Sequence, residues 1–243
     1  METNKNQRFL RHKQNRDFAV QKIQRIFSHQ KSKGFFSEIT KFEWNRQLFH
    51  IFLGIVIVVL LMYGILGYDI TVLGIIIRYV DILGIIILGF LLSYLSKKIK
   101  IPVIYQLLQK LERNEELQRF PGKGTIFYFI GVFVSLMLFP KDIAMASIMV
   151  LALGDSIIHL FGLHYGRTRH PLSKTKFLEG TIAGFAAGFI GAFVFLPWYE
   201  AFFASLAAMI VEAIEVKIGT QQVDDNLLVP LVAGAVVLAI RLF

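Results

Sequence analysis

Long apolar stretches alternate with short polar segments along most of the chain after residue 46. A helix needs about 20 apolar residues to cross the hydrocarbon core of a bilayer, and this pattern predicts an all-α, polytopic integral membrane bundle of about seven spans. In the second span Arg78 and Asp81 are three residues apart and can pair on one helix face, although two short helices are an alternative there. The spans are expected at about 47–67, 70–96, 124–139, 141–164, 178–196, 198–217 and 228–242.

The basic residues predict how these spans are oriented. Twenty-three of the 26 Lys and Arg residues lie in segments that the seven spans place on one side of the membrane, namely 1–46, 97–123, 165–177 and 217–227. The other side receives only Lys141 and Arg241. Because Lys and Arg are enriched in cytosolic loops, we expect the N-terminus in the cytosol and the protein in the cell membrane.

Polar stretches divide the chain into two expected parts, a basic cytosolic region over 1–42 and a transmembrane catalytic domain over 43–243. Around 17–27 apolar residues recur at helical spacing among basic ones, which is typical of a helix on the membrane surface. A partly disordered tail is the alternative for this stretch. A second amphipathic helix is expected over 103–119, and the glycine-rich segment Pro121–Gly124 ends it.

Composition narrows the function classes. Hydrophobic residues make up 55% of the chain and charged residues 18%, which is typical of a membrane protein. The absence of cysteine excludes disulfides, a thiol nucleophile and thiolate metal ligands. We assign the net charge of +9 to anionic lipid headgroups and not to nucleic acid, because no aromatic and basic stacking module accompanies it. The polar, basic start of the chain does not predict a cleavable signal peptide.

Ionisable residues at the cytosolic ends of the spans are the first candidates for chemistry, because charge inside a membrane is costly. Asp155 and His159 are four apart on one face of the fourth span, where a structural aspartate between helices is the alternative. Glu43, Arg46 and His50 share a face where the first span begins. The Arg46 guanidinium suits a phosphate oxygen, with a snorkelling interfacial arginine as the alternative.

A phosphate site is expected where the fifth span begins. Lys174 and Lys176 precede Glu179, Gly180 and Thr181. Basic residues beside a helix N-terminus favour anions, because free backbone N–H groups and the helix dipole face them. Ordinary cytosolic lysines are the alternative explanation for this segment.

Acidic residues at the end of the sixth span and before the seventh suggest a metal site. Glu212 is followed by Asp224, Asp225 and Asn226, and oxygen ligands of this kind suit Mg²⁺. The same residues can also cap the start of a helix. The local pattern leaves these two explanations open.

Together the groups predict phosphoryl transfer to a membrane lipid alcohol. Carboxylates for a metal and cations for phosphates at one membrane face supply the positioning and charge neutralisation that this reaction needs. The segment from Pro121 to Thr125 lacks the spacing of a P-loop, which excludes that fold. Either His50 or Asp155 can accept the proton of the alcohol. A small transporter using Asp155 and His159 as an ion relay is the alternative, but the polar residues gather at one side of the membrane.

These residues resemble those of the CTP-dependent lipid kinases, a family that includes dolichol kinase, phytol kinase and the yeast-type diacylglycerol kinase. The resemblance covers about 43–234. The segment from Arg113 to Gly124 looks most like the archaeal polyprenol kinases. Four elements carry the resemblance: Glu43-x-x-Arg46 with His50; Leu153-Gly154-Asp155 followed by Gly162 and Gly166; Lys176-Phe177-Leu178-Glu179-Gly180-Thr181; and Glu212 with Asp225-Asn226 and Pro230.

The resemblance implies CTP as phosphate donor and a polyprenol such as dolichol as acceptor. Our hypothesis for the roles gives Mg²⁺ to Asp155, Asp225, Asn226 and Glu212, and the nucleotide phosphates to Arg46, Lys174 and Lys176, with Glu179 orienting a lysine. Gln47 and Phe177 stand where the family has Lys and Ser or Thr, and each removes a phosphate contact. Kinases of phytol, geranylgeraniol or diacylglycerol and a lipid-phosphate cytidylyltransferase are the alternatives, and the oligomeric state is not predicted.

Overall fold

The computed structural model describes residues 41–98, 102–112, 114–173, 175–214, 216–218 and 221–243. The chain divides into two units, 1–42 and 43–243, and everything that follows concerns the second. The amphipathic surface helix expected around 17–27 lies outside the described residues.

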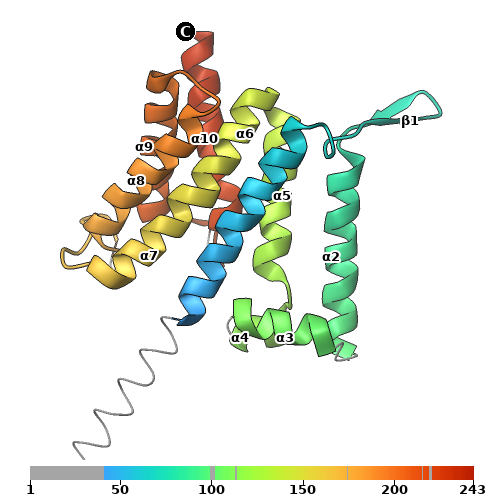
Figure 1. The fold of residues 1–243 in the computed structure, drawn as a ribbon, viewed down its shortest axis with the longest axis horizontal. Helices are drawn as coiled ribbons and strands as arrows, with labels where there is room; N and C mark the ends of the chain where they lie inside the picture. Colours follow the sequence, from blue (N-terminus) through green and yellow to red (C-terminus); the bar gives the residue numbers. More distant parts are fainter. Residues whose placement is uncertain (1–40, 99–101, 113, 174, 215, 219–220) are drawn as a thin grey trace, which may run out of the picture. The chain divides into compact units, whose positions relative to one another are not determined.

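The second unit is a bundle of apolar helices, which confirms the all-α, membrane-type architecture (Figure 1). Four helices are long and apolar enough to cross a membrane by length and composition. They are Lys41–Met62, here called the first helix, α2 (Val80–Lys98), the continuous helix Lys141–Tyr165, and α10 (Asp225–Leu242). The other helices of the bundle are α5 (Lys123–Leu138), α8 (Leu178–Phe193) and α9 (Trp198–Ile214).

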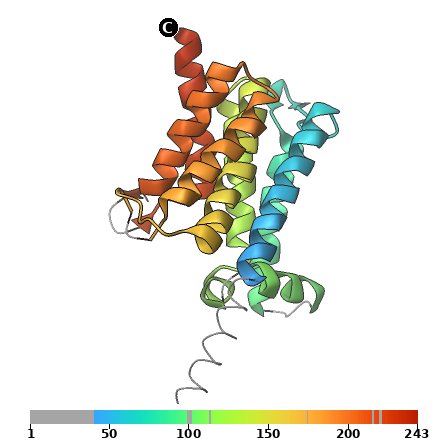
Figure 2. The same cartoon turned by 60° about the vertical axis from the view of Figure 1, so that its left-hand side comes forward.

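Two short helices lie across one end of the bundle in both views (Figures 1 and 2). They are α3 (Pro102–Leu111) and α4 (Asn114–Arg119), in the region where the sequence predicts an amphipathic helix. A positive φ at Gly122 then turns the chain into α5. A small hairpin, β3 (Lys217–Ile218) and β4 (Gln221–Gln222), joins α9 to α10.

The expected span over 70–96 is wrong in its first part. Residues 70–77 form an antiparallel hairpin, β1 (Ile70–Val72) and β2 (Ile75–Ile77), and only then does α2 begin. β-Branched residues favour strands, and Gly74 adopts a positive φ at the turn. Arg78 pairs with Asp69 across the hairpin base at 3.7 Å and not with Asp81, so neither one long helix nor two short helices describe this region.

The helix Lys141–Tyr165 changes its winding midway. It begins as α6 (Lys141–Met149), widens into the π-helix η1 (Val150–Asp155) and continues as α7 (Ser156–Tyr165). Asp155 is the last residue of η1, and its side chain is buried. π-Helical turns are rare and occur frequently at functional sites.

Glycines on α8 allow it to pack closely against this helix. A Cβ atom on Gly180 would lie 2.6 Å from the Ile158 carbonyl oxygen, and one on Gly184 would lie 2.7 Å from the Gly154 carbonyl oxygen. Small residues let membrane helices approach each other in this way. The close packing brings the segment before α8, with Lys176, toward the level of Asp155.

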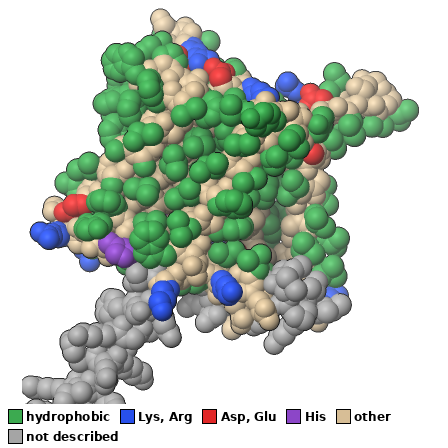
Figure 3. Space-filling model, in the orientation of Figure 1, with side chains coloured by type: hydrophobic (Ala, Val, Ile, Leu, Met, Phe, Trp, Pro, Cys, Tyr) green, Lys and Arg blue, Asp and Glu red, His purple; other side chains and the backbone are tan. Residues whose placement is uncertain are grey.

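The visible face of the bundle carries a broad apolar belt with charged side chains toward its two ends (Figure 3). Large apolar side chains such as Phe52, Ile87 and Ile190 are more than half exposed. Exposed apolar surface on this scale is typical of contact with lipid.

Candidate active site

A cavity of about 570 Å³ opens at the α3–α4 end of the second unit. The first helix, the α3–α4 segment, the start of α5, the η1–α7 helix, the segment before α8 and the start of α10 all contribute to it. Its lining residues include Arg46, Gln47, His50, Glu112, Lys123, Asp155, His159, Lys176, Asp224, Asp225 and Asn226. Segments up to 180 residues apart in sequence therefore meet in one polar site.

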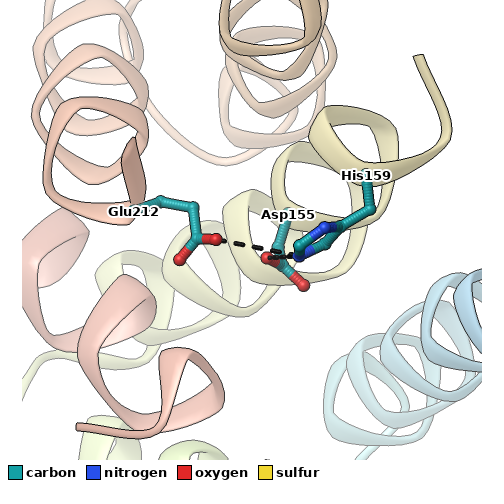
Figure 4. A group of neighbouring side chains, drawn as sticks. All are labelled: Asp155, His159 and Glu212. Atoms are coloured by element: carbon teal, nitrogen blue, oxygen red, sulfur yellow. Dashed lines mark ion pairs between the residues drawn. The ribbon is translucent and has the colours of Figure 1, made fainter. Parts of the chain in front are cut away.

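Asp155, His159 and Glu212 form a close cluster at the cavity (Figure 4). His159 Nε2 lies 3.4 Å from Asp155 Oδ1 and 3.7 Å from Glu212 Oε1. One ligand atom from each of the three residues lies within 4.8 Å of the other two. The helical spacing of four places Asp155 and His159 on one face, and α9 supplies Glu212 from the other side.

Lys176 reaches into this cluster from the segment before α8. Its ammonium donates to the Glu212 carboxylate and to the Glu212 carbonyl oxygen. Burial alone would lower the pKa of Lys176, but the Glu212 carboxylate outweighs it and raises the pKa above 10.5. The lysine is therefore a cation at neutral pH.

The cluster is rich in oxygen atoms that a cation can use. Among the described residues, Asp155 Oδ1, Glu212 Oε2 and Asp225 Oδ1 are buried and have no hydrogen-bond partner. Buried polar atoms normally find a partner, and unsatisfied ones call for an explanation. Mg²⁺ binds through one or two carboxylates together with substrate phosphates, so this donor set fits it.

Cations and their partners surround the rest of the cavity. Lys123 Nζ lies 3.3 Å from Asp224 Oδ2, and Arg46 pairs with Glu43 at 2.9 Å. Asp224 also caps α10 by accepting hydrogen bonds from the backbone and side-chain nitrogens of Asn226. The capping explanation offered for this segment therefore applies to Asp224, while Asp225 faces the cavity.

Three of the expected phosphate-site residues have other contacts. Glu179 accepts hydrogen bonds from the backbone N–H groups of Arg167 and Thr168, at 3.2 and 3.0 Å. Gly180 packs against α7, and the Thr181 hydroxyl donates to the Phe177 carbonyl oxygen just before α8. None of the three is among the described residues lining the cavity, and Lys174 lies outside the described part of the chain.

Glu112 and Lys123 are among the cavity residues that the sequence did not point to. Glu112 is buried at the end of α3, and its Oε2 accepts a hydrogen bond of 2.8 Å from Gly122 N–H. Burial raises the pKa of Glu112 above 4.5, although the Gly122 N–H opposes this. Lys123 follows in the same turn. The glycine-rich turn was the feature of the sequence that could have pointed to these two residues. The contact between Lys123 and Asp224, however, depends on tertiary packing.

Comparison with known proteins gives relatives among the lipid kinases. An uncharacterized protein of Methanocaldococcus jannaschii is 33% identical over 156 residues, which cover 63% of this chain and 75% of that protein. The CTP-dependent diacylglycerol kinase 1 of Saccharomyces cerevisiae is 27% identical over 178 residues, 70% of this chain and 57% of the kinase. Phytol kinase 1 of Arabidopsis thaliana is 29% identical over 136 residues, 49% of this chain and 42% of the kinase.

The chain thus spans only about half the length of these two kinases. No family model matches the chain, and no solved structure matches it. The relatives nevertheless agree with the resemblance carried by the sequence elements around Arg46, Asp155, Lys176 and Asp225. The chain belongs to the family of the CTP-dependent diacylglycerol kinases and the phytol kinases.

Proposed function

We propose that the protein is a CTP-dependent lipid kinase that transfers the γ-phosphate of CTP to a membrane polyprenol of the dolichol type. The observation that carries the proposal is the cavity lined by Asp155, Asp225, Lys123 and Lys176, with the buried Glu212 paired to Lys176. Acidic groups for a cation and ammonium groups for phosphates are what a metal–triphosphate requires. The names of the relatives support CTP as donor and a lipid alcohol as acceptor.

The charged residues at the site divide into two groups in this proposal. Asp155, Glu212 and Asp225, supported by Asn226, would hold Mg²⁺, which supplies charge neutralisation for the phosphate oxygens. Arg46, Lys123 and Lys176 bind the nucleotide phosphates. Lys174 keeps its sequence-based assignment to the phosphates, whereas the contacts of Glu179, Gly180 and Thr181 assign them to holding α8 and the turn before it.

The reaction is a single displacement. The alcohol oxygen forms a bond to the γ-phosphorus, the bond from that phosphorus to the β,γ-bridging oxygen breaks, and CDP leaves. We assign the alcohol proton to His50, because the oxygens of Asp155 are needed for the cation and the His50 ring lines the same cavity.

The proposal includes a topology. The protein lies in the cell membrane with seven crossings, its N-terminus and the cavity facing the cytoplasm, where CTP is available. Anionic headgroups neutralise the basic surface around the cavity. The concentration of Lys and Arg in the segments beside the cavity supports this orientation.

The test uses the purified full chain in lipid nanodiscs with Mg²⁺ and γ-labelled CTP. Polyprenol, phytol and diacylglycerol are offered separately, and we expect labelled polyprenyl phosphate together with CDP. Asp155→Asn should lower the rate by about 100-fold or more. Asp69→Asn, at the hairpin base, removes a carboxylate far from the cavity and should leave the rate unchanged.

Three outcomes would contradict the proposal. Transfer to phytol or diacylglycerol but not to polyprenol would replace the acceptor. Pyrophosphate release in place of CDP, with a lipid phosphate as acceptor, would mean cytidylyl transfer. A folded preparation that labels none of the alcohols, with Asp155→Asn indistinguishable from the unaltered chain, would remove the kinase assignment.

A further inference from the structure

The ammonium group of Lys176 occupies a position that a metal ion would also need. It donates to the Glu212 side chain and to the Glu212 carbonyl oxygen, and both side chains are largely buried. Glu212 is at the same time one of the three residues whose ligand atoms cluster within 4.8 Å. Lys176 therefore neutralises a carboxylate that belongs to the cation site.

The other acidic groups of the cluster have no comparable cationic partner among the described residues. Asp155 Oδ1 and Asp225 Oδ1 are buried without a hydrogen bond, and His159 Nε2 approaches Asp155 only at 3.4 Å. A divalent cation placed here would gain from these oxygens but would face the Lys176 ammonium at contact distance. Like charges at such a distance repel strongly in a partly buried site.

Phosphates offer the displaced ammonium another partner. Lys176 lines the cavity itself, so its ammonium lies beside the space that a phosphate ligand would occupy. A lysine suits such an exchange, because its charge is compact and its stem is flexible, whereas an arginine would hold the carboxylate in a fixed fork. Lys123 does not hold a carboxylate of the cluster in this way, because it pairs with Asp224, which caps α10.

We propose that Lys176 is an exchangeable counter-ion: it holds Glu212 when the cavity lacks a metal, and it transfers to the triphosphate when a divalent cation takes its place. The inference rests on the proposed function, in that the cavity receives a metal and a nucleotide together. Under this proposal the metal and the nucleotide bind cooperatively, because each ligand lowers the free-energy cost of binding the other. By thermodynamic linkage the two affinities change by the same factor.

The experiment measures binding and not turnover. The full chain in nanodiscs is titrated with Mn²⁺, and free Mn²⁺ is followed by electron paramagnetic resonance, alone or with a non-hydrolysable CTP analogue or inorganic tripolyphosphate. Without an anion, Lys176→Met should bind Mn²⁺ about tenfold more tightly or better, because the competing charge is gone. The added tightening by either anion should be smaller in this variant than in the unaltered chain.

Two further variants serve as controls. Lys123→Met removes an ammonium from the same cavity but not from Glu212, and without anion it should raise Mn²⁺ affinity by less than Lys176→Met does. Lys176→Arg keeps the charge and fixes it on Glu212, so it should weaken Mn²⁺ binding. This opposite sign keeps the test informative if Lys176→Met does not fold, which its thermal unfolding would reveal.

The inference is overturned if Lys176→Met or, failing that variant, Lys176→Arg leaves Mn²⁺ affinity unchanged. It is also overturned if neither anion tightens Mn²⁺ binding in the unaltered chain. Cooperative binding of Mn²⁺ and tripolyphosphate without lipid phosphorylation would support the exchange and contradict only the kinase proposal. The two ideas can therefore fail separately.

Discussion

At the scale of single residues, Gly54 decides how closely the first helix approaches η1 and α5. A Cβ atom at this position would collide with Ala152 Cβ and with the Tyr128 hydroxyl. We expect Gly54→Ala to destabilise the protein by about 1–3 kcal/mol, as overpacking does in other well-packed cores. The measurement is unfolding of the purified protein in mixed micelles.

Gly84 provides the matched control for this substitution. It lies within α2, and a Cβ atom there would have no neighbour within 4 Å among the described residues. Gly84→Ala should therefore be neutral or stabilising by up to about 1 kcal/mol, since alanine loses less backbone entropy in a helix. Equal effects of the two substitutions would show that the close contacts of Gly54 with Ala152 and Tyr128 do not limit stability.

Glu112 predicts a pH dependence of stability. Burial raises its pKa in the folded protein, so the folded state holds this proton more tightly than the unfolded state. As the pH rises above 4.5 the unfolded state loses its proton first, and stability falls until the pH passes the folded pKa. Glu112→Gln keeps an acceptor for Gly122 N–H without a charge, so its stability relative to the unaltered chain should rise over this range.

The control for Glu112 is Glu116→Gln, which alters another carboxylate lining the cavity. Melting temperatures of the two variants and the unaltered chain are compared at several pH values from 4 upward. A difference between Glu112→Gln and the unaltered chain that stays constant with pH would contradict the prediction.

The sequence predicts those residues of the candidate site that are unusual by themselves. Asp155 and Asp225 stand out because an acid inside or beside an apolar span requires a reason. Glu112 did not stand out, because an acidic residue on an amphipathic helix normally faces water. Its burial depends on the Gly122 turn folding back over it, and that long-range contact leaves no local pattern in the sequence.

At the scale of secondary-structure elements, the hairpin over residues 70–77 is a region where hydropathy does not predict the secondary structure. Mean hydropathy over a sequence window gives isoleucine and valine the same value whether they lie in a helix or in a strand. The glycine at the turn and the charged pair Asp69 and Arg78 at the base define the hairpin, but neither changes the average. Among the described residues, five of the six other apolar helices begin and end within three residues of the expected spans, because the ends of their hydrophobic runs are marked by charge, Pro or Gly. The first helix, Lys41–Met62, already includes residues before the expected span 47–67 and ends five residues before it does.

The helix ends away from the cavity are joined by one arginine. Arg241 near the end of α10 donates to Glu200 on α9 at 2.8–3.1 Å and pairs with Asp142 on α6 at 2.8 Å. Glu200 is only 3% exposed, whereas the Asp142 side chain is 42% exposed. Removing Arg241 would leave a buried carboxylate without its counter-charge.

We therefore expect Arg241→Met to destabilise the protein by about 3–5 kcal/mol. Asp142→Asn should cost less than about 1 kcal/mol, because an exposed pair contributes little. Both are measured by unfolding in mixed micelles, with the Arg241→Met and Glu200→Gln double variant completing the cycle. If Arg241→Met and Asp142→Asn destabilise the protein equally, the burial of Glu200 does not determine the contribution of these ion pairs to stability.

At the scale of the whole molecule, the two ends of the second unit differ in their charges. Arg46, Lys123 and Lys176 line the cavity, whereas at the opposite end Arg241 pairs with Asp142 and Glu200. An unequal distribution of Lys and Arg orients membrane proteins, so this asymmetry predicts a cavity that opens to the cytoplasm. The orientation also decides which compartment would supply the nucleotide in the proposed reaction.

Because the chain contains no cysteine, single cysteines can test the orientation without background. Leu172 lies exposed in the turn before α8 on the cavity side, and Phe243 is exposed at the far end of α10. In intact cells a membrane-impermeant maleimide should label Phe243→Cys but not Leu172→Cys, and permeabilisation should make Leu172→Cys reactive. The reverse pattern would place the cavity outside the cell, where CTP is scarce, and the nucleotide-dependent function would then fail together with the topology. Labelling of both positions in intact cells would instead indicate that the preparation holds both orientations.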